Sequence, residues 1–398
     1  MSEGLSYFIP HHGRPKISLR IPESHSLHIC PAACGRRSGI RAIRNGTKEH
    51  VSFLYVTEAD ISSGGYEAMI GDAVEELLEL LSPRPRAFQL YVNCIDDFLG
   101  TDENALAAAL SERFPGVGFA VFHIDPVTSD EAIPPGMRQQ ERLYSFLRPG
   151  PHDTGVNLIG AFVPPDPDCE LYSFLRECSA FEVRELTSCP DFEHYQRMAA
   201  SRLNLVLMQM GQYAAKRMEA RLGIPWLFLP ATYDLEQIDA NYQAIANALG
   251  QPCPDLHPYR QAAQRAVSGA LECVGDLSVV VDSSATMQPF ALAAALHRYG
   301  FHVAAVYAAH WKESDRADRL WLEANCPSVR ILCSERYQDI TDCGLSRKVL
   351  AIGYDSAYLL RSRHFVDIQR DEGLFGYYGV ICLMERMGNA ALGITTWR

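Results

Sequence analysis

Several features that would set a chain apart from ordinary globular proteins are absent from these 398 residues. No apolar run approaches the ~18–20 residues of a transmembrane helix, and the first residues lack the charged-then-apolar pattern of a signal peptide. Basic charge is scarce, because 36 Lys and Arg stand against 48 Asp and Glu, a net charge of −12. This acidity argues against nucleic acid or an anionic membrane as the main partner. We therefore expect a cytoplasmic protein that binds neither.

Common catalytic motifs are absent as well. The chain contains no CxxC, no GxGxxG after a predicted strand, no GxSxG and no HExxH. Gly39, Gly46 and Lys48 resemble part of a phosphate-binding loop, but their spacing and order differ from GxxxxGK[ST]. These absences argue against ATP hydrolysis, the usual nicotinamide or flavin site, and the common serine and zinc hydrolases.

What the chain does contain is a repeated alternation of short apolar strands and amphipathic helices. We predict strands at 51–56, 88–92, 119–124, 156–162, 225–229, 277–281, 303–307, 329–332 and 349–352, with helices between them. Short strands that alternate with helices indicate α/β domains with parallel sheets. Proline-rich or hinge-like segments divide the chain into three blocks at 1–150, 151–265 and 266–398.

Three local interpretations bear on the site. An apolar stripe through Leu203, Val206 and Met210 predicts one helix over 203–223, ended by a glycine. The two histidines His25 and His28 are interpreted as solvated turn residues. The segment 30–35 is interpreted as a loop that folds over the edge of the first sheet.

The twelve cysteines are the most informative residues. Most are expected to be small buried hydrophobes. Cys94 ends a predicted strand, Cys30 and Cys34 lie in the preceding loop, and Gly64 and Gly65 permit close backbone approach at the next helix start. Three thiols at one sheet edge, without a histidine partner, favour an iron–sulfur cluster over zinc. The alternative is that the three cysteines share no role.

A Cys₄-type cluster needs a fourth ligand, and no motif of the chain supplies one. A second subunit, Asp96, Asp97 or solvent must provide it.

Six motifs in order give the chain a family resemblance. They resemble those of the nitrogenase component 1 family, which includes the dinitrogenase subunits, their scaffold relatives and the catalytic subunits of tetrapyrrole reductases. The motifs are Cys-Gly-Arg-Arg at 34–37, Glu-x-Asp-Ile-x2-Gly-Gly at 58–65, Asn-Cys-x5-Gly-x-Asp at 93–102, Asn-Leu-Val at 204–206, Gly-Ile-Pro-Trp at 223–226 and Gly-Tyr-Tyr-Gly at 376–379. The resemblance implies three Rossmann-like, doubly wound domains.

The resemblance also implies site residues. Cys34 and Cys94 match two of the family's three cluster cysteines; the third lies upstream in the family, and here Cys30 is the first cysteine and stands in by proximity. Family clusters lie at a subunit interface, which implies a homodimer or a heterodimer with a paralogous subunit. Met208 and Val366 occupy positions where the dinitrogenase α subunit has ligands of the iron–molybdenum cofactor, so that cofactor is not expected.

A substrate pocket is expected where the three domains meet. Its predicted walls carry Met208 at the start of the 203–223 helix, Ser283 in the turn after a strand, and Tyr377 in the Gly-Tyr-Tyr-Gly loop.

The resemblance leaves three functions open. The first is an oxidoreductase component that holds a [4Fe–4S]-type cluster, accepts electrons from a separate ATP-dependent reductase resembling the nitrogenase iron protein, and reduces a small organic, tetrapyrrole-like substrate rather than dinitrogen. The second is a scaffold or carrier for a metal cluster or metallo-tetrapyrrole. The third is a relative without a cluster that binds a small ligand.

Overall fold

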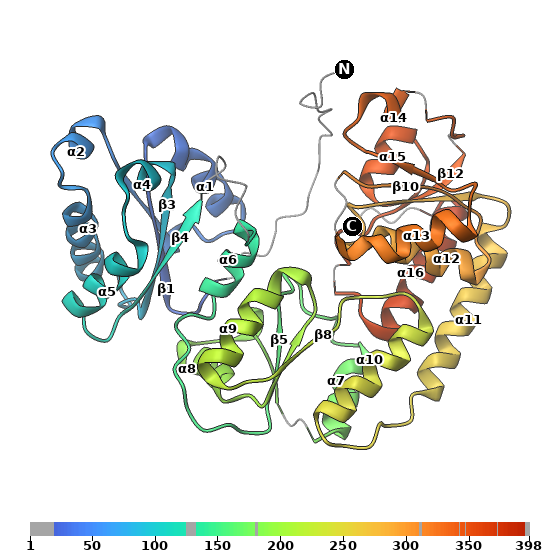
Figure 1. The fold of residues 1–398 in the computed structure, drawn as a ribbon, viewed down its shortest axis with the longest axis horizontal. Coiled ribbons are helices and arrows are strands. Elements are labelled where there is room, and N and C mark those ends of the chain that lie inside the picture. The colour runs from blue at the N-terminus through green and yellow to red at the C-terminus, as the bar shows by residue number, and fades with distance from the viewer. Residues whose placement is uncertain are drawn as a thin grey trace. The chain divides into compact units, whose positions relative to one another are not determined.

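The computed structural model describes residues 20–124, 133–179, 182–309, 313–341, 343–346, 348–371 and 373–394. The chain forms two compact units (Figure 1). The described parts of 15–162 and 180–229 make the first unit, and those of 163–179 and 230–398 make the second. The described residues contain three sheets, and every strand pairing within them is parallel. This confirms the predicted α/β fold class.

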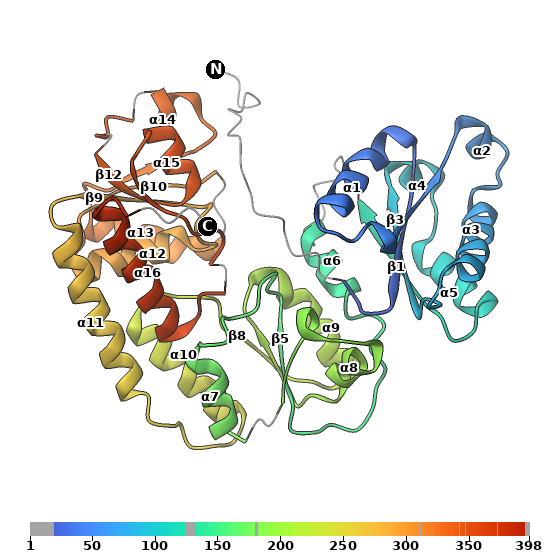
Figure 2. The same cartoon turned by 180° about the vertical axis from the view of Figure 1, so that it is seen from behind.

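The first sheet belongs to the first unit and has the strand order β2-β1-β3-β4. Its strands are β1 (Ser24–Cys30), β2 (Val51–Tyr55), β3 (Ala87–Asn93) and β4 (Gly118–Ile124). One face packs on α3 (Tyr66–Leu80) and α5 (Glu103–Arg113), and α1 (Ala32–Arg44) lies on the opposite face, as both views show (Figure 2). The short helices α2 (Glu58–Ser62), α4 (Cys94–Leu99) and α6 (Pro135–Arg142) complete this part.

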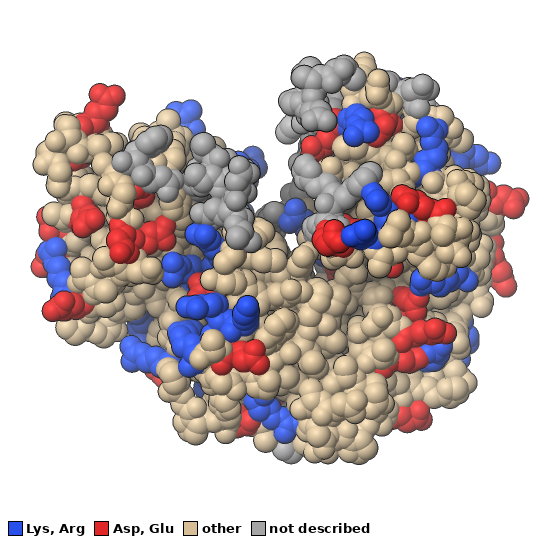
Figure 3. Space-filling view, viewed as in Figure 1, with Lys and Arg blue, Asp and Glu red and all other residues tan. Residues whose placement is uncertain are grey.

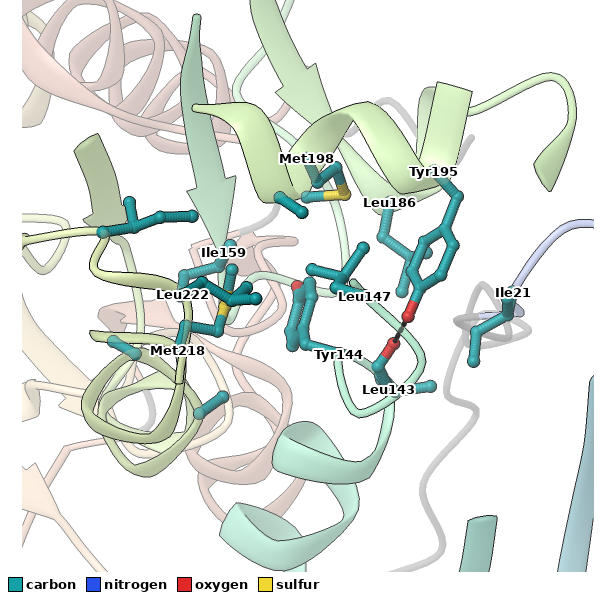
Figure 4. Close-up of a cluster of buried hydrophobic side chains, with 14 of the residues drawn as sticks. Ile21, Leu143, Tyr144, Leu147, Ile159, Leu186, Tyr195, Met198, Met218 and Leu222 are labelled. Carbon is teal, nitrogen blue, oxygen red and sulfur yellow. Dashed lines mark hydrogen bonds between the residues drawn. The ribbon is translucent and has the colours of Figure 1, made fainter. Parts of the chain in front are cut away.

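The second sheet, also in the first unit, has the order β6-β5-β7-β8. Its strands are β5 (Val156–Ile159), β6 (Val183–Glu185), β7 (Leu203–Val206) and β8 (Trp226–Phe228), joined through α8 (Phe192–Arg197) and α9 (Gln212–Leu222). A buried cluster contains side chains from this part and from the first sheet. Within it the Tyr195 hydroxyl donates to the Leu143 carbonyl oxygen at 2.8 Å, so a buried polar group is satisfied (Figure 4).

The third sheet forms the core of the second unit, with the order β11-β10-β9-β12-β13. Its strands are β9 (Ser278–Asp282), β10 (Val303–Tyr307), β11 (Arg330–Leu332), β12 (Val349–Ile352) and β13 (His364–Val366). The helices of the unit are α7 (Glu170–Glu177), α10 (Leu235–Ala248), α11 (His257–Val274), α12 (Pro289–Tyr299), α13 (Arg316–Asn325), α14 (Tyr337–Thr341), α15 (Tyr354–Leu360) and α16 (Gly376–Ala391).

All three sheets are wound in the same way. The chain enters each sheet at an inner strand, β1, β5 or β9, builds outward to one edge, and then returns to fill the other side. Each sheet therefore has one switch point, which lies between β1 and β3, between β5 and β7, and between β9 and β12. This is the doubly wound arrangement, in which ligands bind beyond the carboxyl ends of the strands at the switch point.

The sequence interpretation of the first sheet was incomplete. The innermost strand β1 was not predicted, and the interpretation of His25 and His28 as turn residues was wrong, because both lie in that strand. The Nε2 of His25 lies 2.8 Å from the Ser52 hydroxyl, and His28 stacks between Phe53 and Tyr91 at centroid distances of 5.2 and 4.5 Å. Histidine between aromatic rings behaves as a flat core residue, which a polarity pattern does not reveal.

Two further local predictions were wrong. The segment expected to be a loop after Cys30 is the helix α1, whose buried residues Gly35 and Ala42 lie two turns apart on one face. The segment 203–223 is not one helix, because residues 203–206 form the buried strand β7, followed by a 3₁₀ turn and α9. A short, mostly apolar run such as Leu-Asn-Leu-Val fits a buried strand as well as a helix, and the neighbouring strands β5 and β8 select the strand.

The remaining strand predictions agree with the structure to within a few residues. The two compact units combine stretches differently from the three predicted domains, and the domain boundaries near residues 150 and 265 remain a prediction. Across the described residues, no helix has the length and apolar character needed to span a bilayer.

Candidate metal centre

The three predicted cluster cysteines lie around the switch point of the first sheet. Cys30 is the last residue of β1, and Cys94 follows directly after β3, the neighbouring strand. The register of these parallel strands pairs His28 with Tyr91, so Cys30 and Cys94 both lie at the carboxyl edge of the sheet. Cys34 lies in the first turn of α1, immediately beyond β1.

The three thiols differ in exposure. Cys30 is buried, Cys94 is half-buried and Cys34 is exposed. Burial, together with the nearby Cys34, raises the pKa of the Cys30 thiol to about 11. Because the thiolate is the ligating form, metal binding at Cys30 must displace a proton.

Glycines leave room beside these thiols. A Cβ on Gly35 would lie 2.9 Å from the Phe53 ring and 3.2 Å from the Cys30 Sγ, so only glycine fits there without a shift. Gly64 has a left-handed φ of +72°, and no atom lies within 4 Å of the position of its missing Cβ. Gly65 is the N-cap of α3 and is also uncrowded, with a side-chain oxygen of Ser63 at 3.6 Å. The backbone at these two glycines is therefore open to approach from outside the chain.

Asp96, one of the residues considered as a fourth ligand, is already engaged. Its Oδ1 accepts a hydrogen bond from the Tyr66 hydroxyl at 2.8 Å, and its Oδ2 accepts one from the Asn93 backbone N–H at 3.1 Å. Asp96 is buried, and this burial raises the pKa of its carboxyl group. The side chain of Asp97 lies outside the described residues.

Within the described part of the chain, no three His, Cys, Asp or Glu side chains are arranged to hold a metal ion. The three cysteines nevertheless lie near the carboxyl edge of the first sheet, and thiols are the donors that iron–sulfur clusters use. The chemistry of these thiols suits such a cluster, and the ligand set itself remains a prediction.

Comparison with known proteins identifies the family. Residues 16–392 match the family model for nitrogenase component 1 type oxidoreductases. The chain belongs to the nitrogenase component 1 type oxidoreductase family.

Curated relatives of this family member match it over part of their length. The nitrogenase molybdenum-iron protein alpha chain of Clostridium pasteurianum is 26% identical over 202 residues, which cover 46% of this chain and 35% of the relative. The nitrogenase iron-molybdenum cofactor biosynthesis protein NifE of the same organism is 23% identical over 198 residues, which cover 48% of this chain and 42% of the relative. The matches thus span well under half of each relative.

Solved structures support the fold of this nitrogenase component 1 family member. A structure titled nitrogenase Cp1 at pH 6.5 superposes with a TM-score of 0.67 at 14% identity, over 95% of this chain and 90% of that chain. A second, nitrogenase Cp1 at pH 5, gives a TM-score of 0.60 at 15% identity. At this identity the likeness establishes the shared α/β architecture.

The second predicted group, for substrate or cofactor binding, is distributed over both units. Met208 is half-buried beyond the end of β7, at the switch point of the second sheet. Ser283 follows β9, at the switch point of the third sheet, and its N–H donates to the Tyr307 carbonyl oxygen at 3.0 Å. Since Met208 and Ser283 belong to different units, their common pocket remains a prediction.

Tyr377 is anchored inside the second unit. Its ring is buried and stacks on Tyr242 at 5.8 Å, and its hydroxyl donates to Asp239. Its N–H donates to the buried Glu170 at 2.6 Å. The Glu170 carboxylate thus accepts a hydrogen bond from the first turn of α16. These bonds give the Tyr377 side chain partners within the fold.

His364 is the histidine nearest to Val366, the position that matches the histidine ligand of the iron–molybdenum cofactor. It already has a hydrogen-bond partner within the fold. It begins β13, and its Nδ1 lies 2.9 Å from the Ala390 carbonyl oxygen in α16. Val366, at the matching position, is buried.

Sequence reasoning missed a buried carboxyl pair at the third switch point. Asp282 ends β9 and accepts hydrogen bonds from the N–H and hydroxyl of Ser356 at 2.7 and 2.6 Å. Burial and the charges of Asp282 and Glu335 raise the pKa of Asp355 to about 7. No local motif joins these residues, because Asp282 ends β9 whereas Asp355 and Ser356 lie in α15, which follows the neighbouring strand β12.

Proposed function

We propose that this chain is the cluster-bearing component of a two-component reductase. Cys30, Cys34 and Cys94 would hold a [4Fe–4S]-type cluster between this chain and a second subunit. Proteins of this family bind metal–sulfur clusters and usually work with a partner reductase. Here a separate ATP-dependent reductase would supply the electrons, and a small organic substrate would receive them.

One observation supports this proposal: Cys30 at the end of β1, Cys94 directly after the neighbouring strand β3, and Cys34 in α1 lie around one switch point. A bound iron–sulfur cluster accepts and releases single electrons. The residues of the chain would then keep water away and hold the thiols in place, through the buried Cys30 and the closely packed Gly35.

The proposed substrate is not dinitrogen. The residue at the position of the cysteine ligand to the iron–molybdenum cofactor is Met208, whose thioether is a weak ligand beside a thiolate. The histidine position carries the buried Val366. We therefore propose a pocket that is apolar at Met208 and holds an organic, tetrapyrrole-like molecule.

Iron and acid-labile sulfide content, with an EPR spectrum, tests the cluster on protein made and kept without oxygen. We expect Cys34→Ser and Cys94→Ser to lose most of the iron. Cys273→Ser and Cys189→Ser are matched controls, because Cys273 is exposed like Cys34 and Cys189 is half-buried like Cys94. Wild-type protein without iron, or iron that survives both Cys34→Ser and Cys94→Ser, would overturn the proposal.

A scaffold function is the second candidate, and the partial match to a cofactor biosynthesis protein favours it. The two functions share the cluster and differ in its fate. Transfer of the intact cluster to an acceptor protein would select the scaffold. Retention of the cluster during repeated oxidation and reduction with a bound substrate would select the reductase.

A further inference from the structure

Asn93 joins the two strand ends that carry Cys30 and Cys94. It is the last residue of β3, next to Cys94. Its Nδ2 donates to the carbonyl oxygen of Ile29, next to Cys30, at 3.1 Å. Its Oδ1 accepts from the N–H of Ile95, on the other side of Cys94, at 3.0 Å. One amide thus contacts the residues that flank both cysteines.

The backbone of Asn93 is itself held by a buried pair. Its N–H donates to the Asp96 Oδ2 at 3.1 Å, and the Tyr66 hydroxyl donates to the Asp96 Oδ1 at 2.8 Å. Tyr66 is the first residue of α3 and is 5% exposed. The network therefore ties β1, β3, the start of α4 and the start of α3 at one edge.

The strand ladder cannot set the spacing of the cysteines by itself. The register between β1 and β3 extends to His28 and Tyr91, short of both cysteines. Beyond it the chain enters α1 after Cys30 and α4 at Cys94, and the pairing between β1 and β3 does not continue. The Asn93 amide supplies the last hydrogen bond across this gap.

We propose that Asn93 is a positioning residue that sets the separation of Cys30 and Cys94 for the cluster. This inference rests on the proposed function. Residues around the direct ligands typically change metal affinity by about 10–100-fold when they are removed. The Asn93 amide is such a residue, because it acts on the backbone on both sides of Cys94.

Gln89 provides a matched control on the same two strands. It is a buried amide of β3, and its Oε1 accepts a hydrogen bond from the Ser26 hydroxyl of β1 at 3.2 Å. It also joins β3 to β1, but four residues before Asn93, where Ser26 pairs with Gln89. Gln89→Ala therefore removes a bridge of the same kind without touching the cysteine edge.

The test uses full-length protein reconstituted with iron and sulfide under anaerobic conditions. We expect Asn93→Ala to release iron to a chelator about 10–100-fold more readily than wild type and to shift the EPR g values and the midpoint potential of the cluster. Gln89→Ala should leave the g values and potential unchanged. Tyr66→Phe should move them in the same direction as Asn93→Ala, but less.

Asn93→Asp keeps the test decisive if Asn93→Ala fails to fold. The aspartate retains an acceptor for the Ile95 N–H and loses the donor to the Ile29 oxygen, so it removes the bridge and adds one negative charge. Because that charge also acts on the midpoint potential, iron release to the chelator is the measurement that counts for this variant. Wild-type g values and chelator sensitivity in the folded Asn93 variants would overturn this inference and leave the proposed function standing. Wild-type protein without a cluster would overturn both.

Discussion

At the scale of single residues, Gly35 is the most constrained position near the candidate metal centre. Helical glycine costs about 0.5–1 kcal/mol relative to alanine, so its presence inside α1 needs a reason. The reason is space, because a Cβ there would press on Phe53, Cys30 and Tyr55. Gly39, one turn later, would meet Phe53 only at 3.6 Å, an ordinary contact.

We therefore expect the two glycines to respond oppositely to alanine. Gly35→Ala should lower the free energy of unfolding by about 1–3 kcal/mol through overpacking. Gly39→Ala should raise it by up to about 1 kcal/mol through helix propensity. Urea denaturation of the metal-free protein measures both. Equal stabilisation by the two substitutions would show that α1 does not press on β2 at Gly35.

At the scale of elements, β1 is the inner strand that the local sequence pattern did not predict. It lies between β2 and β3, and its two histidines, a serine pair and a cysteine give it a polar sequence. The face opposite α3 carries a row of adjacent rings across all four strands, all stacked except the tilted last pair. In order these are Tyr55, Phe53, His28, Tyr91 and Phe122, with centroid distances of 5.9, 5.2, 4.5 and 4.9 Å.

The buried strand β1 should make the first unit sensitive to acid. Burial, and secondarily the charge of Arg41, lowers the pKa of His28 to about 4. The pKa of a histidine in the unfolded chain is about 6.5. Above that pH, His28 is neutral in both the folded and the unfolded protein, so its protonation does not change the free energy of unfolding. Between pH 6.5 and 4 only the unfolded state takes up the proton, so His28 costs about 1.4 kcal/mol of stability per pH unit.

The variant His28→Phe keeps a flat ring in the stack and removes the titration. We expect its free energy of unfolding to fall less steeply than that of wild type between pH 6.5 and 4, and in parallel with wild type above pH 7. Urea midpoints at several pH values measure the two slopes. Identical slopes would show that His28 is accessible to protons in the folded protein.

At the scale of the whole molecule, the surface charge is not uniform despite the net charge of −12. Basic side chains gather over α8 and α9 on the face that Figure 3 shows. One arginine of α9 is structural, because the Arg221 guanidinium donates to the carbonyl oxygens of Ser145 and Leu147 at 2.6 and 2.9 Å. Local basic charge here therefore serves the fold as well as the surface.

The incomplete cysteine set leads us to expect a dimer that includes α1. This helix exposes Ile40 (47%) and Ile43 (68%), and the edge strand β2 exposes Tyr55 (51%). The exposed part of the helix also carries four arginines, Arg36, Arg37, Arg41 and Arg44. Arginine and aromatic residues are enriched in protein interfaces.

Ile43→Arg should weaken the dimer at least tenfold in Kd, which corresponds to about 1.4 kcal/mol. Leu80→Arg is the control, since Leu80 is 69% exposed on α3, on the opposite face of the first sheet. Sedimentation equilibrium across micromolar concentrations measures both variants. A wild-type protein that is monomeric with its cluster bound would contradict the expectation.

The sequence alone was sufficient for the α/β class, the family and most strands. In the third sheet, four of the five described strands were predicted to within two residues, because they are short apolar runs between helix caps and turn residues. It also pointed to Cys94, since a residue after a parallel strand lies at the carboxyl edge of the sheet. Cys34 was proposed from the family resemblance and Cys30 from its proximity to Cys34.

The tertiary structure alone decided which segments become inner strands and how the site is held. β1 and β7 are strands because neighbouring strands on both sides supply hydrogen bonds, which a local pattern does not contain. The bridge from Asn93 to Ile29 joins residues 64 positions apart. Such contacts depend on which strands become neighbours in the sheet, and periodicity along the chain carries no information about that choice.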